Sequence, residues 1–158
     1  MRRFELTILG SNSALPAYGR FPTSQYLTVA NRHFLIDCGE GCQIRMSQYK
    51  VKRTKISHIF ISHLHGDHLY GLPGVIGSMN HMSRKAKLHI IGPVGLKEYL
   101  ETCFRVGEVR LNFEIDIKEI LLDAKGSGLI GEKSLSIGFS VIGIADYQKS
   151  NTNSKFAY

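Results

Sequence analysis

The sequence has few cysteines and no long apolar stretch. Its three cysteines, Cys38, Cys42 and Cys103, are odd in number and lack the spacing of a disulfide framework, so a reducing cytoplasm is expected. No apolar run approaches the roughly 20 residues that a membrane helix requires. The first residues lack the apolar segment of a signal peptide. These absences favour a globular cytoplasmic protein without a membrane partner.

Acidic residues are outnumbered, with 13 Asp and Glu against 20 Lys and Arg and a formal net charge of +7. This charge favours polyanionic partners, because Lys and Arg displace the counterions of phosphate groups. A basic protein with no nucleic-acid role is the alternative, and charge alone does not separate the two. The 158 residues are 43% hydrophobic and 21% charged, which suits a globular domain. We expect that domain over residues 1–149, and a disordered polar tail over residues 150–158.

The apolar pattern predicts an α/β layered domain, because strand-like and helix-like segments alternate. Strands are predicted over residues 4–9, 26–29, 33–37, 56–61, 88–91, 113–117 and 135–141. A polar turn at residues 30–32 makes a hairpin of the second and third strands. Helices are predicted over residues 42–49, from Pro73 and from Pro93, because proline suits a first helical turn.

A histidine-rich cluster, His63-x-His65-x-Asp67-His68, directly follows the apolar strand at residues 56–61. Neutral imidazoles and a carboxylate are the ligands that zinc prefers. His63 and His65 are two residues apart and point the same way if the chain is extended, so they can hold one ion. Asp67 and His68 can then face a second ion, since Gly66 lets the backbone turn between the two pairs.

A solvated histidine-rich loop, or a metal site without a catalytic purpose, would explain the same residues. The position of the cluster favours function, because sites in α/β sheets lie beyond the carboxyl ends of strands. Four ligands on one loop cannot complete the coordination of two ions. The remaining ligands must therefore come from elsewhere in the fold or from a partner chain.

Motifs in four stretches lie in and around this cluster. They are Leu9-Gly10-Ser11-Asn12-Ser13-Ala14-Leu15-Pro16, Phe34-Leu35-Ile36-Asp37-Cys38-Gly39-Glu40-Gly41, Ile59–Gly74 and Ile91-Gly92-Pro93-Val94-Gly95-Leu96. The third contains the ligands followed by Gly-Leu-Pro-Gly. Together these stretches resemble ribonuclease Z, the tRNA 3′-processing endonuclease family of the metallo-β-lactamase superfamily. The match covers roughly the first two-thirds of the chain.

The resemblance implies a metallo-β-lactamase αββα sandwich, present here as an N-terminal half or truncated, with two zinc ions in the complete site. By position, His63 and His65 would bind one zinc and Asp67 and His68 the other, and Asp67 would also act in proton transfer. Asp37 would lie behind the loop and orient a ligand histidine or the loop backbone. A turn or capping carboxylate is the other interpretation of Asp37.

The implied activity is a zinc-dependent endoribonuclease that removes 3′ trailers from precursor tRNA by metal-activated hydroxide attack. The alternatives are a small-molecule phosphodiesterase or esterase of the same fold, and a non-catalytic metal- or RNA-binding fragment. The family supplies further ligand histidines late in its chain, whereas this sequence has none after His89. We therefore expect a second copy of the chain, or a missing C-terminal half, as a partner.

The other polar residues are interpreted more simply. His33 and His58 are expected to be hydrogen-bonded or surface histidines, and Cys38 and Cys42 small buried residues. His81 could face the site from its helix, although a surface role is favoured, and His89 is not assigned. Two basic clusters, at residues 50–55 and 84–87, could contact phosphates but are expected to be solvated turns. Tyr18, Arg20 and Phe21 could meet an RNA end. No substrate-binding residue is assigned.

Overall fold

The computed structural model describes residues 4–122, 128–130 and 133–134. It divides into two compact units, residues 1–119 and residues 120–158, which are considered separately. The strand expected over residues 135–141 and the tail expected over residues 150–158 lie outside the described residues.

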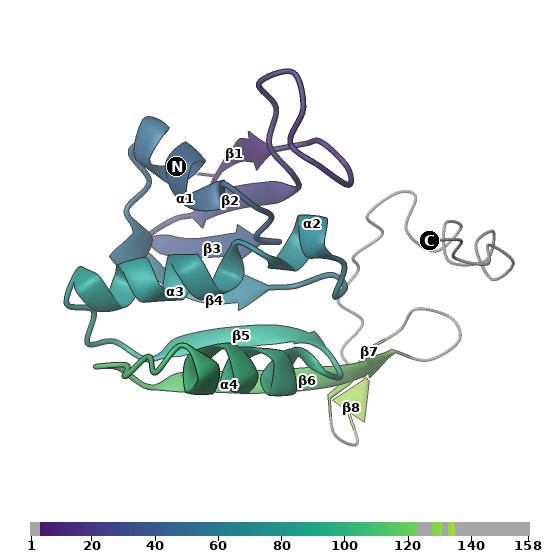
Figure 1. Ribbon diagram of the computed structural model, residues 1–158, viewed down its shortest axis with the longest axis vertical. Coiled ribbons are helices and arrows are strands. Elements are labelled where there is room, and N and C mark those ends of the chain that lie inside the picture. The colour runs from purple at the N-terminus through teal and green to yellow at the C-terminus, as the bar shows by residue number, and fades with distance from the viewer. Residues whose placement is uncertain (1–3, 123–127, 131–132, 135–158) are drawn as a thin grey trace, which may run out of the picture. The chain divides into compact units, whose positions relative to one another are not determined.

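The first unit is built on a mixed sheet. Its strands are β1 (Phe4–Gly10), β2 (Ser24–Val29), β3 (Arg32–Ile36), β4 (Ile56–Phe60), β5 (Leu88–Pro93) and the start of β6 (Ile115–Leu122). The first five are neighbours in chain order, as Figure 1 shows. β1, β2 and β3 pair antiparallel, whereas β3, β4 and β5 pair parallel. Parallel pairing brings the carboxyl ends of β3, β4 and β5 to the same edge of the sheet.

Helices connect the parallel strands, as a parallel sheet requires. They are α1 (Cys42–Gln48), η1 (Arg53–Lys55), α2 (Gly66–Leu69), α3 (Leu72–His81) and α4 (Leu96–Val106). Central sheet residues Leu35, Ile59 and Ile90 are fully buried in one hydrophobic cluster that also contains residues of α1, α3 and α4. Full burial of each such side chain contributes about 1.5–3 kcal/mol. This cluster fixes the strands whose ends carry the metal-ligand candidates.

The opposite face of the sheet is less buried. Its side chains alternate with those of the core, so Phe4, Leu6 and Ile8 on β1 lie on this face and are 71%, 51% and 46% exposed. Phe34 and Phe60, on β3 and β4, are half-buried, and their rings lie 6.2 Å apart. The first unit therefore carries a row of apolar side chains that its own core does not use.

Most predicted elements are confirmed, with three corrections at element ends and short helices. Pro93 ends β5 and does not open a helix; α4 begins at Leu96, after Gly95 in the left-handed conformation at φ 99°. Phe113 lies before β6, which begins at Ile115. The short helices η1 and α2 were not predicted, because one turn of helix has no apolar period.

The second unit contains the end of β6 and two short strands, β7 (Gly128–Ile130) and β8 (Lys133–Ser134). Both pairings are antiparallel, with Leu121 opposite Leu129 and Leu129 opposite Ser134. Among the described residues of the chain, no helix has the length and apolarity needed to cross a membrane.

Candidate metal centre

The metal loop, residues 62–68, leaves the carboxyl end of β4 and turns into α2. One ligand atom each from His63, Asp67 and His68 lies within 4.8 Å of the other two. In residues 4–122, 128–130 and 133–134, no other group of three or more His, Cys, Asp or Glu side chains comes this close. Two imidazole nitrogens and a carboxylate oxygen this close together could hold a metal ion.

His65 lies beside this group. Its ring meets the ring of His63 edge-on, with centroids 4.7 Å apart, while the rings of His63 and His68 are 3.9 Å apart. The backbone of His65 is extended, with φ −67° and ψ 147°, and the helical turn of α2 starts at the next residue. This turn brings Asp67 and His68 back toward His63, so the structure brings three of the four predicted ligands together, while His65 contacts the group through its ring.

Asp37 supports the metal loop from below. It directly follows β3, is 4% exposed and has a left-handed backbone at φ 55°. Its carboxylate accepts hydrogen bonds from the Ser62 backbone N–H (2.8 Å), the Ser62 hydroxyl (2.9 Å) and Nδ1 of His68 (2.8 Å). A left-handed Asp costs of order 1–3 kcal/mol, which these three bonds offset. Asp37 thus lies where it orients both a ligand histidine and the loop backbone.

The bond from His68 to Asp37 decides which nitrogen of His68 can bind a metal. A carboxylate only accepts, so Nδ1 carries the proton and Nε2 keeps its lone pair. Nε2 lies 3.5 Å from Oδ2 of Asp67, on the side of the other ligand atoms. Burial by itself lowers the pKa of His68, but the hydrogen bond and charge of Asp37, with the charge of Asp67, raise it overall.

Ser62 determines in the same way which nitrogen of His63 is protonated. Its hydroxyl proton goes to Asp37, so the oxygen can only accept from Nδ1 of His63, 3.0 Å away. His63 is then also protonated on Nδ1, with Nε2 available for a metal. Burial lowers the pKa of His63, and the neighbouring imidazoles of His68 and His65 lower it further, which favours the neutral ligand form.

Asp67 connects the metal loop to the first loop of the chain. Its Oδ2 accepts a hydrogen bond of 2.9 Å from the backbone N–H of Ala14, whose φ is 62°. Burial raises the carboxyl pKa of Asp67, but this N–H and the nearby imidazoles outweigh burial and lower it. Asp67 is therefore ionised at neutral pH and can serve as a metal ligand.

Two glycines allow the backbones around the site to touch. A Cβ atom at Gly71 would lie 2.2 Å from the carbonyl oxygen of Gly39, and one at Gly39 would lie 2.3 Å from the carbonyl oxygen of Asp67. The Cys38 N–H donates to the carbonyl of His68, and the Gly71 N–H donates to the carbonyl of Cys38, both at 2.8 Å. The Asp-Cys-Gly segment and the metal loop are thus joined backbone to backbone.

The remaining candidates lie outside this cluster. His33 contacts Tyr26, His58 stacks on His89, and His81 is an exposed residue at the end of α3. Cys38 and Cys42 are buried, as expected, and burial raises the pKa of the Cys38 thiol, which leaves it unreactive. Tyr18 is fully exposed in the first loop. The sequence alone did not identify Ser62 or the Ala14 N–H; its only signal was that Ser62 directly precedes His63.

The mixed sheet, the helices on one face and the ligand loop at the carboxyl end of β4 define a metallo-β-lactamase fold. Solved structures support this class. Human tRNase Z, short form, superposes with a TM-score of 0.72 and 31% sequence identity, over 81% of this chain and 56% of that one. The metallo-β-lactamase-fold protein YhfI from Bacillus subtilis has a TM-score of 0.58 at 19% identity, over 75% of this chain and 45% of that one.

The chain belongs to the family described as Anti-Pycsar protein Apyc1, whose model matches residues 4–120. Curated relatives confirm the resemblance to ribonuclease Z. The ribonuclease Z of Cytophaga hutchinsonii is 50% identical over 112 residues, which are 71% of this chain and 36% of that protein. The ribonuclease Z of Parabacteroides distasonis is 38% identical over 138 residues, 87% of this chain and 45% of that protein. The chain thus spans less than half the length of these relatives.

Proposed function

We propose that this chain carries the metal-binding part of a zinc-dependent endoribonuclease that removes 3′ trailers from precursor tRNA. The observation that carries the proposal is the cluster of His63, Asp67 and His68, held by Asp37. It occurs in a sequence 50% identical to a ribonuclease Z over the same region. Two zinc ions in such a site would supply an activated hydroxide and stabilise the attacking and leaving oxygens of a phosphodiester.

The residues of the site would have distinct roles. His63 and His65 would hold one zinc, and Asp67 and His68 the other. Asp37 and Ser62 keep the ligand nitrogens aimed at the site through the hydrogen bonds described above. Asp67 would also act in proton transfer through its carboxylate.

We propose further that the missing ligands come from the part of a ribonuclease Z that this chain does not span. Three donors in one cluster leave even a single tetrahedral ion one ligand short, and His65 alone cannot complete two. The exposed apolar row that includes Phe4, Leu6 and Ile8 supplies a surface for such a C-terminal half. A second copy of this chain is the competing arrangement. Sedimentation of the chain alone as a concentration-dependent dimer would favour that second copy.

A small-molecule phosphodiesterase of the same fold is the second candidate. The family whose model matches residues 4–120 is not named for an RNA-processing enzyme, unlike the curated relatives. Both candidates use the same metal ligands, so metal binding alone does not separate them. Their substrates, precursor tRNA and small phosphodiesters, separate the two candidates.

The test uses this chain together with a C-terminal half taken from a curated relative. We expect zinc-dependent cleavage of precursor tRNA at the 3′ end of the mature sequence, and loss of cleavage in the His65→Ala variant. The matched control is His81→Ala, because His81 is an exposed histidine outside the cluster. Unchanged tRNA cleavage in His65→Ala would disprove the metal mechanism. Hydrolysis of bis-p-nitrophenyl phosphate without tRNA cleavage would favour the second candidate.

A further inference from the structure

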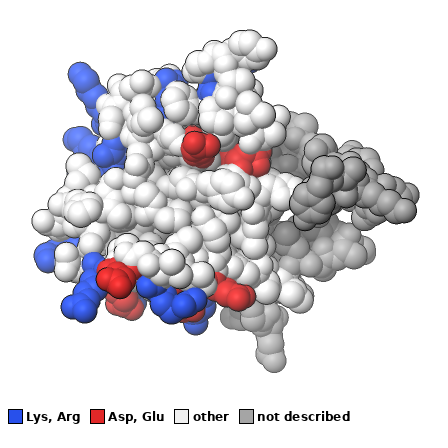
Figure 2. Space-filling model, viewed as in Figure 1, with Lys and Arg blue, Asp and Glu red and all other residues white. Residues whose placement is uncertain are grey.

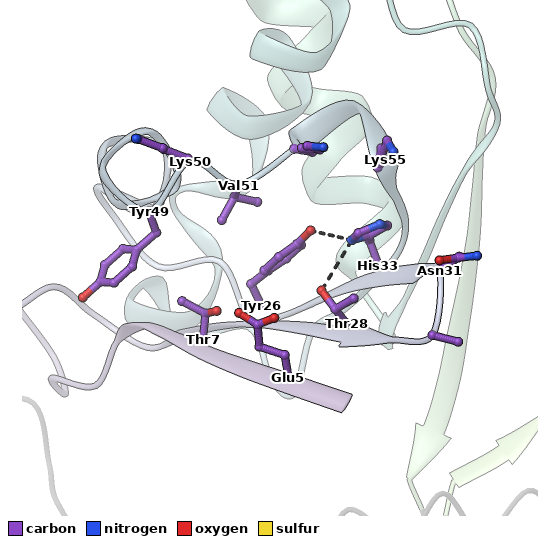
Figure 3. Close-up of a pocket in the computed structure, with 12 residues that line it drawn as sticks. Glu5, Thr7, Tyr26, Thr28, Asn31, His33, Tyr49, Lys50, Val51 and Lys55 are labelled. Atoms are coloured by element: carbon purple, nitrogen blue, oxygen red, sulfur yellow. Dashed lines mark hydrogen bonds between the residues drawn. The ribbon is translucent and has the colours of Figure 1, made fainter. Parts of the chain in front are cut away.

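A polar cavity lies away from the metal loop, at the amino end of β3. Its volume is about 610 Å³, within the 300–1,000 Å³ typical of ligand pockets. We call it the basic pocket. It is lined by Glu5, Thr7, Tyr26, Thr28, Ala30, Asn31, His33, Tyr49, Lys50, Val51, Lys52 and Lys55 (Figure 3). None of these residues belongs to the metal loop or contacts it through a described hydrogen bond.

The floor of the basic pocket is a polar patch on the helix-covered side of the sheet. Thr7 pairs with Tyr26 and Thr28 pairs with His33 across neighbouring strands, so their side chains share one face. Tyr26 and Thr28 are each only 8% exposed. Further along the same face the sheet carries Leu35 and Ile59, which belong to the core. The sheet therefore changes from apolar to polar at this end.

The floor is held together by hydrogen bonds to one histidine. The Tyr26 hydroxyl lies 2.5 Å from Nδ1 of His33, and the Thr28 hydroxyl lies 3.5 Å from the same atom. The rings of Tyr26 and His33 also stack, with centroids 5.8 Å apart and planes 15° from parallel. This network holds the hydroxyl and imidazole groups of the floor in fixed positions.

The wall of the basic pocket is cationic. Lys50, Lys52 and Lys55 lie within six residues of one another on the connector between α1 and β4. Figure 3 shows Lys50 and Lys55 on one side of the pocket and Glu5 on the other. In Figure 2, blue Lys and Arg side chains gather at the left edge of the molecule, where this connector runs in Figure 1. Three ammonium groups oppose one carboxylate, so the pocket attracts anions.

We propose that the basic pocket binds a phosphate group, carried either by an RNA strand or by a free nucleotide. Lysines supply the charge, and Thr7 and Asn31, which also line the pocket, carry a hydroxyl and an amide that can donate hydrogen bonds to phosphate oxygens. His33 and Asp37 lie at opposite ends of β3, about 13 Å apart at 3.3 Å per residue. A phosphate here is therefore not the one being cleaved, and the inference does not depend on the proposed reaction.

The experiment measures phosphate binding to the chain after metal removal with EDTA, so that zinc cannot hold the anion. Isothermal titration at low salt uses three probes: inorganic phosphate, adenosine 5′-monophosphate and a single-stranded RNA of about 12 nucleotides. The test variant carries Lys50→Gln, Lys52→Gln and Lys55→Gln. We expect its affinity for the bound probe to fall on the order of tenfold or more.

The matched control removes the same total charge elsewhere. It carries Lys85→Gln, Lys97→Gln and Lys118→Gln, which are also exposed lysines but lie outside the basic pocket. We expect a loss of no more than about twofold from this change in overall charge. Equal losses in the two variants would overturn the proposal, as would failure of the wild-type chain to bind any probe.

The probes also identify the source of the phosphate. Tighter binding of RNA than of the monophosphate, with a salt dependence that weakens in the test variant, supports an RNA strand. Comparable binding of the monophosphate and RNA supports a free nucleotide. Because the metal-free protein is used, loss of the proposed ribonuclease activity would leave this result unaffected.

Discussion

The two ends of β3 each hold a polar site, and the sites have opposite character. Beyond its carboxyl end, Asp37 and Asp67 place two carboxylates among the imidazoles of the metal loop. Near its amino end, His33 contacts the Tyr26 hydroxyl beside a wall of lysines. A histidine at the first end has its Nδ1 proton held by a carboxylate and offers Nε2 to a cation. A histidine at the second end contacts two hydroxyl groups, in a pocket that is lined by three lysines and one glutamate.

All of these histidines lie on or beside the same sheet. The difference in their chemistry therefore comes from the groups that each histidine contacts. His58 and His89 provide an intermediate case. Their rings stack at 4.8 Å, and Nδ1 of His89 lies 3.0 Å from Asp116. One carboxylate is present, yet these residues do not form a group of three close ligand atoms among the described residues. Convergence of donors, in addition to a carboxylate partner, distinguishes the metal loop.

The largest predicted effect is on zinc binding. His63→Ala removes one of three converging ligand atoms, so zinc affinity should fall at least about 100-fold, beyond the usual effect of losing a supporting residue. His33→Ala is the matched control and should change zinc affinity less than about twofold, because the other end of β3 is not built for cations. Titration against a zinc chelator measures both. Similar losses in the two variants would remove the distinction between the ends of β3.

The second prediction concerns backbone packing at the metal end. Gly71→Ala forces a Cβ atom to within 2.2 Å of the Gly39 carbonyl oxygen and should destabilise the chain by about 1–3 kcal/mol. Gly77→Ala is the control, because no atom lies within 4 Å of its Cβ position in α3, and it should stabilise the helix by up to about 1 kcal/mol. Urea unfolding checks both signs. Unchanged stability in Gly71→Ala would mean that the backbones at Gly39 and Gly71 separate easily.

The third prediction tests the role of Ser62 in selecting the His63 nitrogen. Ser62→Ala should lower zinc affinity by about tenfold, whereas Ser62→Thr keeps the hydroxyl and should retain most of the affinity. In the metal-free chain, ¹⁵N chemical shifts of His63 should report protonation on Nδ1 in the wild type and a mixture of tautomers in Ser62→Ala. Unchanged shifts in Ser62→Ala would show that another contact sets the tautomer.

The smallest predicted effect is on how the stability of the fold depends on pH. This dependence should have opposite signs in the metal-free and the zinc-bound chain. The pKa of His68 is raised in the fold, so in the metal-free chain its pairing with Asp37 stabilises the fold below the unfolded pKa of about 6.5. That contribution disappears as pH rises through the higher folded pKa. Zinc competes with the proton, so the zinc-bound chain should instead gain stability over the same rise. Thermal unfolding at several pH values, with zinc or EDTA, measures the two slopes. Parallel slopes would exclude His68 as a ligand.

Much of this architecture follows from local sequence pattern. The apolar run at residues 56–61 predicts β4, and the histidine-rich segment after it predicts a ligand loop at the edge of the sheet. The hairpin of β2 and β3 was predicted from its polar turn. These features depend on neighbours in the chain, so a single sequence contains the information needed to predict them.

Features that depend on distant contacts were not predicted from the sequence. The hydrogen bond between Ala14 and Asp67 joins residues 53 positions apart, and no local pattern indicates it. The lysines of the basic pocket were interpreted as a solvated turn, because their relation to Tyr26 and His33 exists only after the sheet has formed. The start of α4 was misplaced, because Pro93 suits a first helical turn, whereas it ends β5 and α4 begins only after the left-handed Gly95.

The hydrogen bond that the Ala14 N–H donates to Asp67 should respond to metal binding at the metal loop. A cation bound by Asp67 draws electron density from its carboxylate and so weakens the hydrogen bond that the Ala14 N–H donates to Oδ2. The amide proton resonance of Ala14 should therefore shift as zinc is added, in step with occupancy. Metal binding would thus be measurable in a loop that is distant in sequence from the metal ligands, without any substrate.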